Sequence, residues 1–164
     1  MPENSGFRRD IVKAVMAAGS DDVTDVAARA DAVNSVLHMP EFLAIAAACK
    51  RMRNILKQAK EKGFHISADF DYSIESAEEA KMLDAKARHM SDRVEQDRAK
   101  KDYLSALIML STLREDVDHF FDKVMVMVDN DDRVRANRLA LLQTLCKEFS
   151  TIADFSEIVT EGKT

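Results

Sequence analysis

The chain has 164 residues, of which 46% are hydrophobic, so it is long enough to bury one sizeable core but short for two domains. Only 4 residues are Gly and 2 are Pro, which argues against an all-β protein, because sheets need more turn residues. The formal net charge of −5 argues against a protein that holds DNA by bulk electrostatics, but it does not exclude a local basic surface. We therefore expect one all-α domain.

The N-terminal third of the chain is predicted to form three helices. Apolar residues at helical spacing predict a first helix over residues 7–18. A second helix starts with Asp21 or Asp22 as its cap and ends before Pro40. Because proline fits the first turn of a helix, Pro40 opens the third helix, which reaches Lys62. The expected buried stripe of the second helix is Val26, Ala30, Val33 and Leu37.

The remainder of the chain is predicted to contain one long loop and four further helical pieces. The stretch 64–76 has no helical period, so we expect it to be the longest loop. The later elements are expected at 76–96, 102–113, 114–126 and 134–155, with a polar turn at 129–132. Together these elements predict an antiparallel bundle of about six to seven helices.

Valine and methionine alternate from Val124 to Val128, which taken alone is the pattern of a β-strand. The run is short, however, and both flanks have helical spacing. We interpret it as the end of a buried helix that leads into a tight turn. Met125 and Met127 are accordingly expected to pack in the core, since methionine fills irregular gaps between helices.

Cysteine usage and the absence of long apolar stretches bear on where the protein works. Cys49 and Cys146 each fall among apolar residues and form no CxxC pattern, which favours buried, reduced thiols over a disulfide or a zinc site. The first residues lack the apolar region of a signal peptide, and no stretch approaches the roughly 18 apolar residues of a membrane span. We expect a soluble, cytoplasmic protein.

The third predicted helix carries the clearest candidate for a binding surface. At 100° per residue, Lys50, Arg53, Lys57 and Lys60 gather on one side, while apolar residues occupy another. This pattern suits contact with the phosphates of a nucleic acid, and Asn54 beside the cations could add a hydrogen bond. A solvated lysine-rich surface produces the same pattern, and periodicity alone favours that second interpretation.

Three arginines at the start of the last helix have different expected roles. Arg138 projects with the apolar residues of that helix, so its guanidinium needs a buried partner and its expected role is structural. Its candidate partners are Asp118, Asp122 and Asp129. Arg133 and Arg135 are predicted to lie at the exposed start of the helix, where they are freer to meet a ligand.

The sequence shows no catalytic apparatus. Glu115, Asp118, His119 and Asp122 could face one side of a helix, but no second cluster completes a metal site. Serine nucleophile contexts, glycine-rich phosphate loops and nucleotide-binding signatures are missing as well. We expect no catalytic residue, no metal and no cofactor, and no catalysis by this chain alone.

Two runs of sequence resemble a known family. The run "LREDVDHFFDKVMVMVDNDDRVRANRLALLQTLCKEFSTIADFSEI" closely resembles the C-terminal end of the β-subunit of bacterial two-subunit glycyl-tRNA synthetase, with its pattern LRpxVDxFFDxVMVMxxD…RxNRLxLLxxL…FxxxADxSxL. Upstream, "DVAARADAVNSVLHMPEFLAIAAACKRMRNILKQA" is similar to the family's RxxAL…PEFxxLAxAxKRxxNIL segment. Val33 stands where that segment usually has leucine. The resemblance covers residues 6–159.

The resemblance implies an all-helical anticodon-binding domain of the DALR type, shared with arginyl-tRNA synthetases. It also implies that residues 1–164 are one domain from a longer β-subunit, and that glycine activation with ATP belongs to a separate α-subunit. The expected partners are the anticodon region of glycine tRNA and, through the full β-subunit, the α-subunit, with no membrane and no DNA. The alternative is a helical protein-interaction or structural domain without direct RNA readout.

Overall fold

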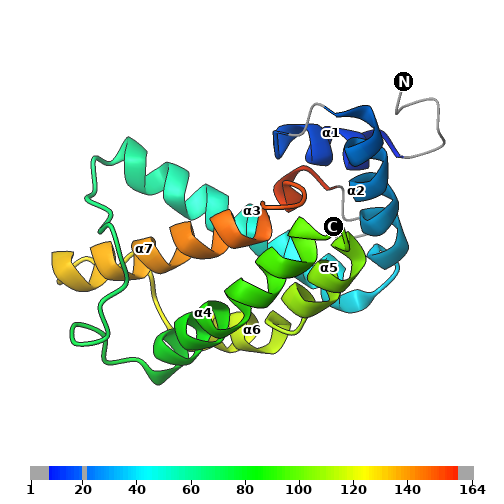
Figure 1. The fold of residues 1–164 in the computed structure, drawn as a ribbon. Helices are drawn as coiled ribbons and strands as arrows, with labels where there is room; N and C mark the ends of the chain where they lie inside the picture. The colour runs from blue at the N-terminus through cyan, green and yellow to red at the C-terminus, as the bar shows by residue number, and fades with distance from the viewer. Residues whose placement is uncertain (1–7, 20–21, 159–164) are drawn as a thin grey trace.

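The computed structural model describes residues 8–19 and 22–158, which form an all-helical domain without a strand in those ranges (Figure 1). The helices are α1 (Arg9–Ala17), α2 (Val23–Val36), α3 (Pro40–Glu61), α4 (Glu78–Ala99), α5 (Tyr103–Ser111), α6 (Arg114–Lys123), α7 (Asp132–Phe149) and the short 3-10 helix η2 (Phe155–Glu157). The prediction of an all-α bundle of about six to seven helices is confirmed.

The helix ends follow the capping residues in the sequence. The Asp22 side chain accepts a hydrogen bond from the backbone N–H of Thr24 at 3.0 Å, so Asp22 is the N-cap of α2, while Asp21 lies outside the described residues. Pro40 opens α3 as predicted, and Gly63 follows its end with a φ of 71°, a conformation that favours glycine. Local chemistry therefore sets where these helices begin and end.

The helices surround a core that is fully buried at its centre. In Figure 1, α3 and α7 lie beside each other, α4 packs on α5 and α6, and α2 packs on α1 and α5. The largest fully buried side chains include Phe42, Phe120, Phe149 and Phe155. Within the described ranges, no single helix has the length and apolarity to cross a membrane, and only α2 and α3 together, bent by 113°, would meet that test.

The Val/Met stretch differs from the prediction. Helix α6 ends at Lys123, and Val124 is already extended, with φ −119° and ψ 125°. Val124 and Val126 are buried, whereas the Met125 side chain between them is 68% exposed. The predictions of a buried helix end and of a core position for Met125 are therefore wrong. Period-two alternation was the correct signal, although residues 124–128 pair with no other strand in the described part of the chain.

The last helix is shorter than predicted, because α7 ends at Phe149 rather than near Phe155. Ile152 is still buried, so the apolar spacing continues although the backbone has turned away. The guanidinium of Arg29 binds the backbone just after the turn: its Nη1 donates hydrogen bonds to the carbonyls of Thr151 at 2.8 Å and Ile152 at 3.0 Å. Apolar periodicity alone could not reveal this long-range arginine contact.

Candidate nucleic-acid interface

The outer side of α3 presents the predicted cations to solvent. Lys57, Lys60 and Asn54 are exposed, and Lys50 is half-buried on the same side. We call Lys50, Asn54, Lys57 and Lys60 the lysine face of α3. In the described part of the chain, none of its three lysines makes an ion pair, and a surface ammonium without a partner can meet a phosphate at little cost.

Arg53, which the sequence grouped with these lysines, is engaged inside the domain. Its Nη2 lies 2.9 Å from Oδ2 of Asp154, whose side chain is only 7% exposed. Asp154 also caps η2 by accepting a hydrogen bond from the backbone N–H of Ser156 at 3.1 Å. Because the Arg53 side chain is 53% exposed, it joins α3 to the segment before η2 while part of it still faces solvent.

Arg133 and Arg135, at the start of α7, were both predicted to be exposed, but their side chains differ in burial. Arg133 is exposed, but Arg135 is only 7% exposed, so the prediction of an exposed Arg135 is wrong. Its guanidinium carbon lies 3.7 Å from the ring centre of Phe64, and its Nη1 donates to the carbonyl of Val128 at 3.1 Å. Its Nη2 also pairs with Asp132 at 2.9 Å. The ring of Phe64, from the loop after α3, covers the side chain.

Arg138 is 8% exposed and binds a carboxylate that the sequence did not suggest. Its Nη2 donates to Oε2 of Glu75 at 2.7 Å and its Nε to Oε1 at 3.0 Å, so the three predicted aspartate partners are wrong. Burial raises the pKa of Glu75, but hydrogen bonds from Arg138 and from the backbone N–H of Ala77 outweigh it and hold the pKa below its ordinary value. The Nη1 of Arg138 donates to the carbonyl of Met125 at 2.7 Å.

Asn137, which sequence reasoning missed, fastens the loop between α3 and α4. It is fully buried, its Oδ1 accepts from the backbone N–H of Asp71 at 2.7 Å, and its Nδ2 donates to the carbonyl of Asp71 at 3.0 Å. A backbone hydrogen bond of 3.1 Å between the Ser67 N–H and the Ala136 carbonyl lies beside it. Asn137 lies within the run that resembles the known family, and that is the one signal in the sequence that could have identified it. Residues 135–138 thus position both the loop and the extended segment 124–128.

A cleft opens where α3 ends and α7 begins. It has a volume of about 520 Å³, and its lining includes Phe64, His65, Arg133 and Arg135. An aromatic ring beside cations suits an unpaired nucleotide, because every base can stack and every phosphate attracts a cation. The lining also includes Gly63, which follows α3, so the cleft lies close in sequence to Lys60 in the last turn of that helix.

The other sequence candidates do not assemble into a site. Glu115, Asp118, His119 and Asp122 line an open hollow, but Arg114 already lies 3.4 Å from Asp118. Among the described residues, no group of three or more acidic, histidine or cysteine side chains could hold a metal ion.

Both cysteines carry free thiols. Cys49 is buried, as predicted, whereas Cys146 is only half-buried. Burial raises the pKa of both thiols, that of Cys146 to about 11, so neither is a ready nucleophile at neutral pH.

The sequence of this chain is similar to one domain family and to subunits of one enzyme. The DALR anticodon binding domain family matches residues 45–159. The chain is 51% identical over 163 residues to the glycine–tRNA ligase beta subunit of Acidobacterium capsulatum. This alignment covers 97% of this chain and 23% of that subunit. It is 40% identical to the same subunit of Syntrophus aciditrophicus, with 97% and 22% covered, and 41% identical to that of Acinetobacter baylyi, with 94% and 22% covered.

The chain spans 21 to 23% of the length of the curated relatives it matches. The matched residues 45–159 include most of α3, all of α4 to α7, and the cleft between α3 and α7. The chain belongs to the DALR anticodon binding domain family and resembles the part of glycine–tRNA ligase beta subunits that carries this domain.

Proposed function

We propose that this domain binds the anticodon region of glycine tRNA. The observation that carries the proposal is the match of residues 45–159 to an anticodon binding domain, which takes in both the lysine face and the cleft at the start of α7. The relatives are named as glycine–tRNA ligase beta subunits, which supports glycine tRNA as the RNA.

Binding would combine positioning by cations with readout of unpaired bases. Lys50, Lys57 and Lys60 would contact backbone phosphates, with Asn54 as a hydrogen-bonding neighbour and Arg133 as a further cation at the cleft. Because the net charge is −5, attraction to RNA has to come from these local cations rather than from the whole domain. The unpaired bases of an anticodon loop are accessible on their edges and faces, so they can supply the specificity.

The domain would serve a larger enzyme. We infer that it acts within a longer beta subunit in the cytoplasm, and that an alpha subunit carries out glycine activation. The coverage of 23% of the Acidobacterium capsulatum subunit supports the first part of this inference. We expect the purified chain to show no glycine-dependent ATP–pyrophosphate exchange, and exchange by a preparation free of alpha subunit would contradict that expectation.

A titration can test the proposed function without the rest of the enzyme. Glycine tRNA is compared with the same tRNA in which only the three anticodon bases are replaced, so that the phosphate backbone stays constant. We expect the replacement to weaken binding about tenfold, in line with the free energy of one or two base contacts. Equal and weak binding of both RNAs would instead favour a helical domain that contacts proteins.

A further inference from the structure

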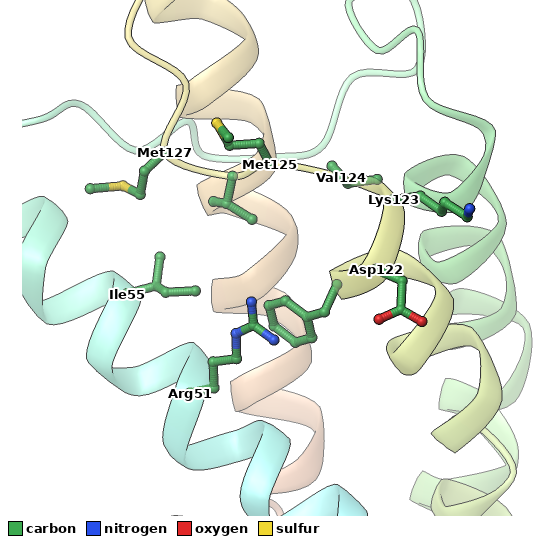
Figure 2. A pocket seen from close by; sticks show the side chains of 9 residues that line it. Arg51, Ile55, Asp122, Lys123, Val124, Met125 and Met127 are labelled. Atoms are coloured by element: carbon green, nitrogen blue, oxygen red, sulfur yellow. The ribbon is translucent and has the colours of Figure 1, made fainter.

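A groove separates α3 from the extended segment that follows α6 (Figure 2). Its volume is about 450 Å³, and its lining includes Arg51 and Ile55 from α3 and Phe121, Met125 and Met127 from the opposite side. The Arg51 guanidinium carbon lies 4.2 Å from the ring centre of Phe121, so a planar cation covers an aromatic face. In the described part of the chain Arg51 makes no ion pair, which leaves its outer face for a ligand.

The far wall of the groove is fixed in place by buried arginines. Arg138 binds the Met125 carbonyl and Arg135 binds the Val128 carbonyl, while the side chains of Val124 and Val126 are buried beneath the segment. Exposed methionines are common on protein surfaces, but the backbone around Met125 is fixed by arginine hydrogen bonds to the carbonyls of Met125 and Val128. Met125 and Met127 thus form an adaptable apolar rim on a rigid support.

The same segment offers backbone groups without partners. Within the described residues, the N–H groups of residues 125–128 and the carbonyls of residues 124, 126 and 127 make no hydrogen bond. Across a trans peptide the N–H points opposite to the preceding carbonyl, so the Val126 N–H points away from Arg138. Backbone donors and acceptors that lie beside an apolar groove can recognise the polar edge of a base.

The groove also borders the lysine face of α3. Arg51 follows Lys50 and Ile55 follows Asn54, so each lies about 100° around the helix from a member of that face. About 120° separates Arg51 from Lys57 around the helix, with Asn54 and Lys50 between them, so an RNA strand that contacts these side chains crosses the exposed side of α3 towards the mouth of the groove. This continuity favours RNA over a protein partner as the occupant.

We propose that this groove binds one unpaired nucleobase of the RNA loop, which stacks on the Arg51 guanidinium and touches Met125 and Met127. The proposal rests on the proposed function and names one place on the domain where a base is read. Arginine planes and aromatic rings are common stacking platforms for single-stranded bases, and the soft methionine side chains adjust to the outline of the base.

Methyl NMR on the chain labelled with ¹³C at its methionine methyl groups tests the proposal directly. The probe is the anticodon stem-loop of glycine tRNA, and the matched control is the same hairpin with abasic sugars at every loop position. The ring current of a bound base shifts the signals of the methyl groups that it touches, so the intact hairpin should move the Met125 and Met127 signals, and the abasic hairpin should not. The Met82 and Met16 methyls, exposed on α4 and α1, serve as internal controls that stay in place.

The outcomes separate the groove from the proposed function. If the intact hairpin binds but leaves the Met125 and Met127 methyls unmoved, or if the abasic hairpin moves them equally, the groove does not hold a base although the domain still binds RNA. If neither hairpin binds at saturating concentration, the proposed function fails and the groove proposal fails with it.

A pair of variants provides a second, independent readout. Arg51→Lys keeps the charge but removes the planar stacking surface, so affinity for the intact hairpin should fall about tenfold while affinity for the abasic hairpin stays the same. Lys57→Gln should weaken both hairpins alike, because it removes only a phosphate contact. An Arg51→Lys variant that binds the intact hairpin as the parent chain does would overturn the proposal.

Discussion

Two arginines of α7, Arg135 and Arg138, have a different role in this domain from the lysines of α3. Arg135 and Arg138 are buried, and their guanidinium groups contact two carboxylates, two backbone carbonyls and one aromatic ring. Lys57 and Lys60 are exposed and make no ion pair within the described residues. One set of cations shapes the surface, and the other is free to meet a ligand on it.

This difference follows from the chemistry of the two side chains as well as from their positions. A guanidinium presents several donors in a fixed plane, so a single arginine can hold two segments at once, as Arg138 holds Glu75 and the Met125 carbonyl. An ammonium on a flexible stem stays well hydrated at the surface and behaves as a mobile point charge. Changes to the two sets should therefore affect different measurements, stability for α7 and RNA affinity for α3.

The largest expected effect is the loss of Arg138. Arg138→Ala leaves the Glu75 carboxylate buried without its cation, which should lower the free energy of unfolding by about 3 kcal/mol. Urea denaturation followed by circular dichroism measures this change. Combining Arg138→Met with Glu75→Gln removes both charges and should recover part of the loss. A parent-like melting temperature for Arg138→Ala would show that the pair does not stabilise the domain.

The same ion pair predicts a specific response to acid. Because the folded-state pKa of Glu75 lies below its ordinary value of 4.5, the carboxylate favours the folded state at any pH above 4.5. That contribution is lost as the pH falls below 4.5 and through the folded-state pKa. Glu75→Gln should be less stable than the parent at pH 7, but its stability should decline less steeply between pH 5 and pH 2. Parallel acid profiles for the two proteins would contradict this assignment.

A smaller effect is expected at Arg53, which lies between the two sets. Arg53→Ala removes the only cation paired with the buried Asp154 in the described structure, and it should lower the free energy of unfolding by about 1 kcal/mol, since the arginine is half exposed. Lys57→Ala, on the same helix, is the matched control and should leave stability unchanged. Equal unfolding curves for the two variants would show that the Arg53–Asp154 ion pair does not stabilise the domain.

The sequence predicts the helices well because their signals are local. Asp22 and Pro40 mark helix starts through their own side chains, and apolar spacing identifies the buried sides. It predicts the candidate interface less well, because Arg53, Arg135 and Arg138 have partners in segments distant along the chain; for Arg138 the structural role was predicted but the partner was not. Glu75 lies 63 positions before Arg138, in a loop without periodicity, so no local pattern could point to it. The family resemblance adds what spacing could not, namely an anticodon-binding domain and therefore RNA as the expected ligand.

The central claim is that the exposed lysines of α3 bind RNA without contributing to stability. The most direct test measures RNA affinity and stability in the Lys57→Gln/Lys60→Gln double variant. Affinity for glycine tRNA is measured at two salt concentrations, with thermal unfolding by circular dichroism on the same samples. We predict weaker binding at low salt, a salt slope reduced by about 1.4 for two lost contacts to a single-stranded loop, and an unchanged melting temperature. Binding with the parent affinity and the parent salt slope would contradict the assignment of the lysine face to RNA.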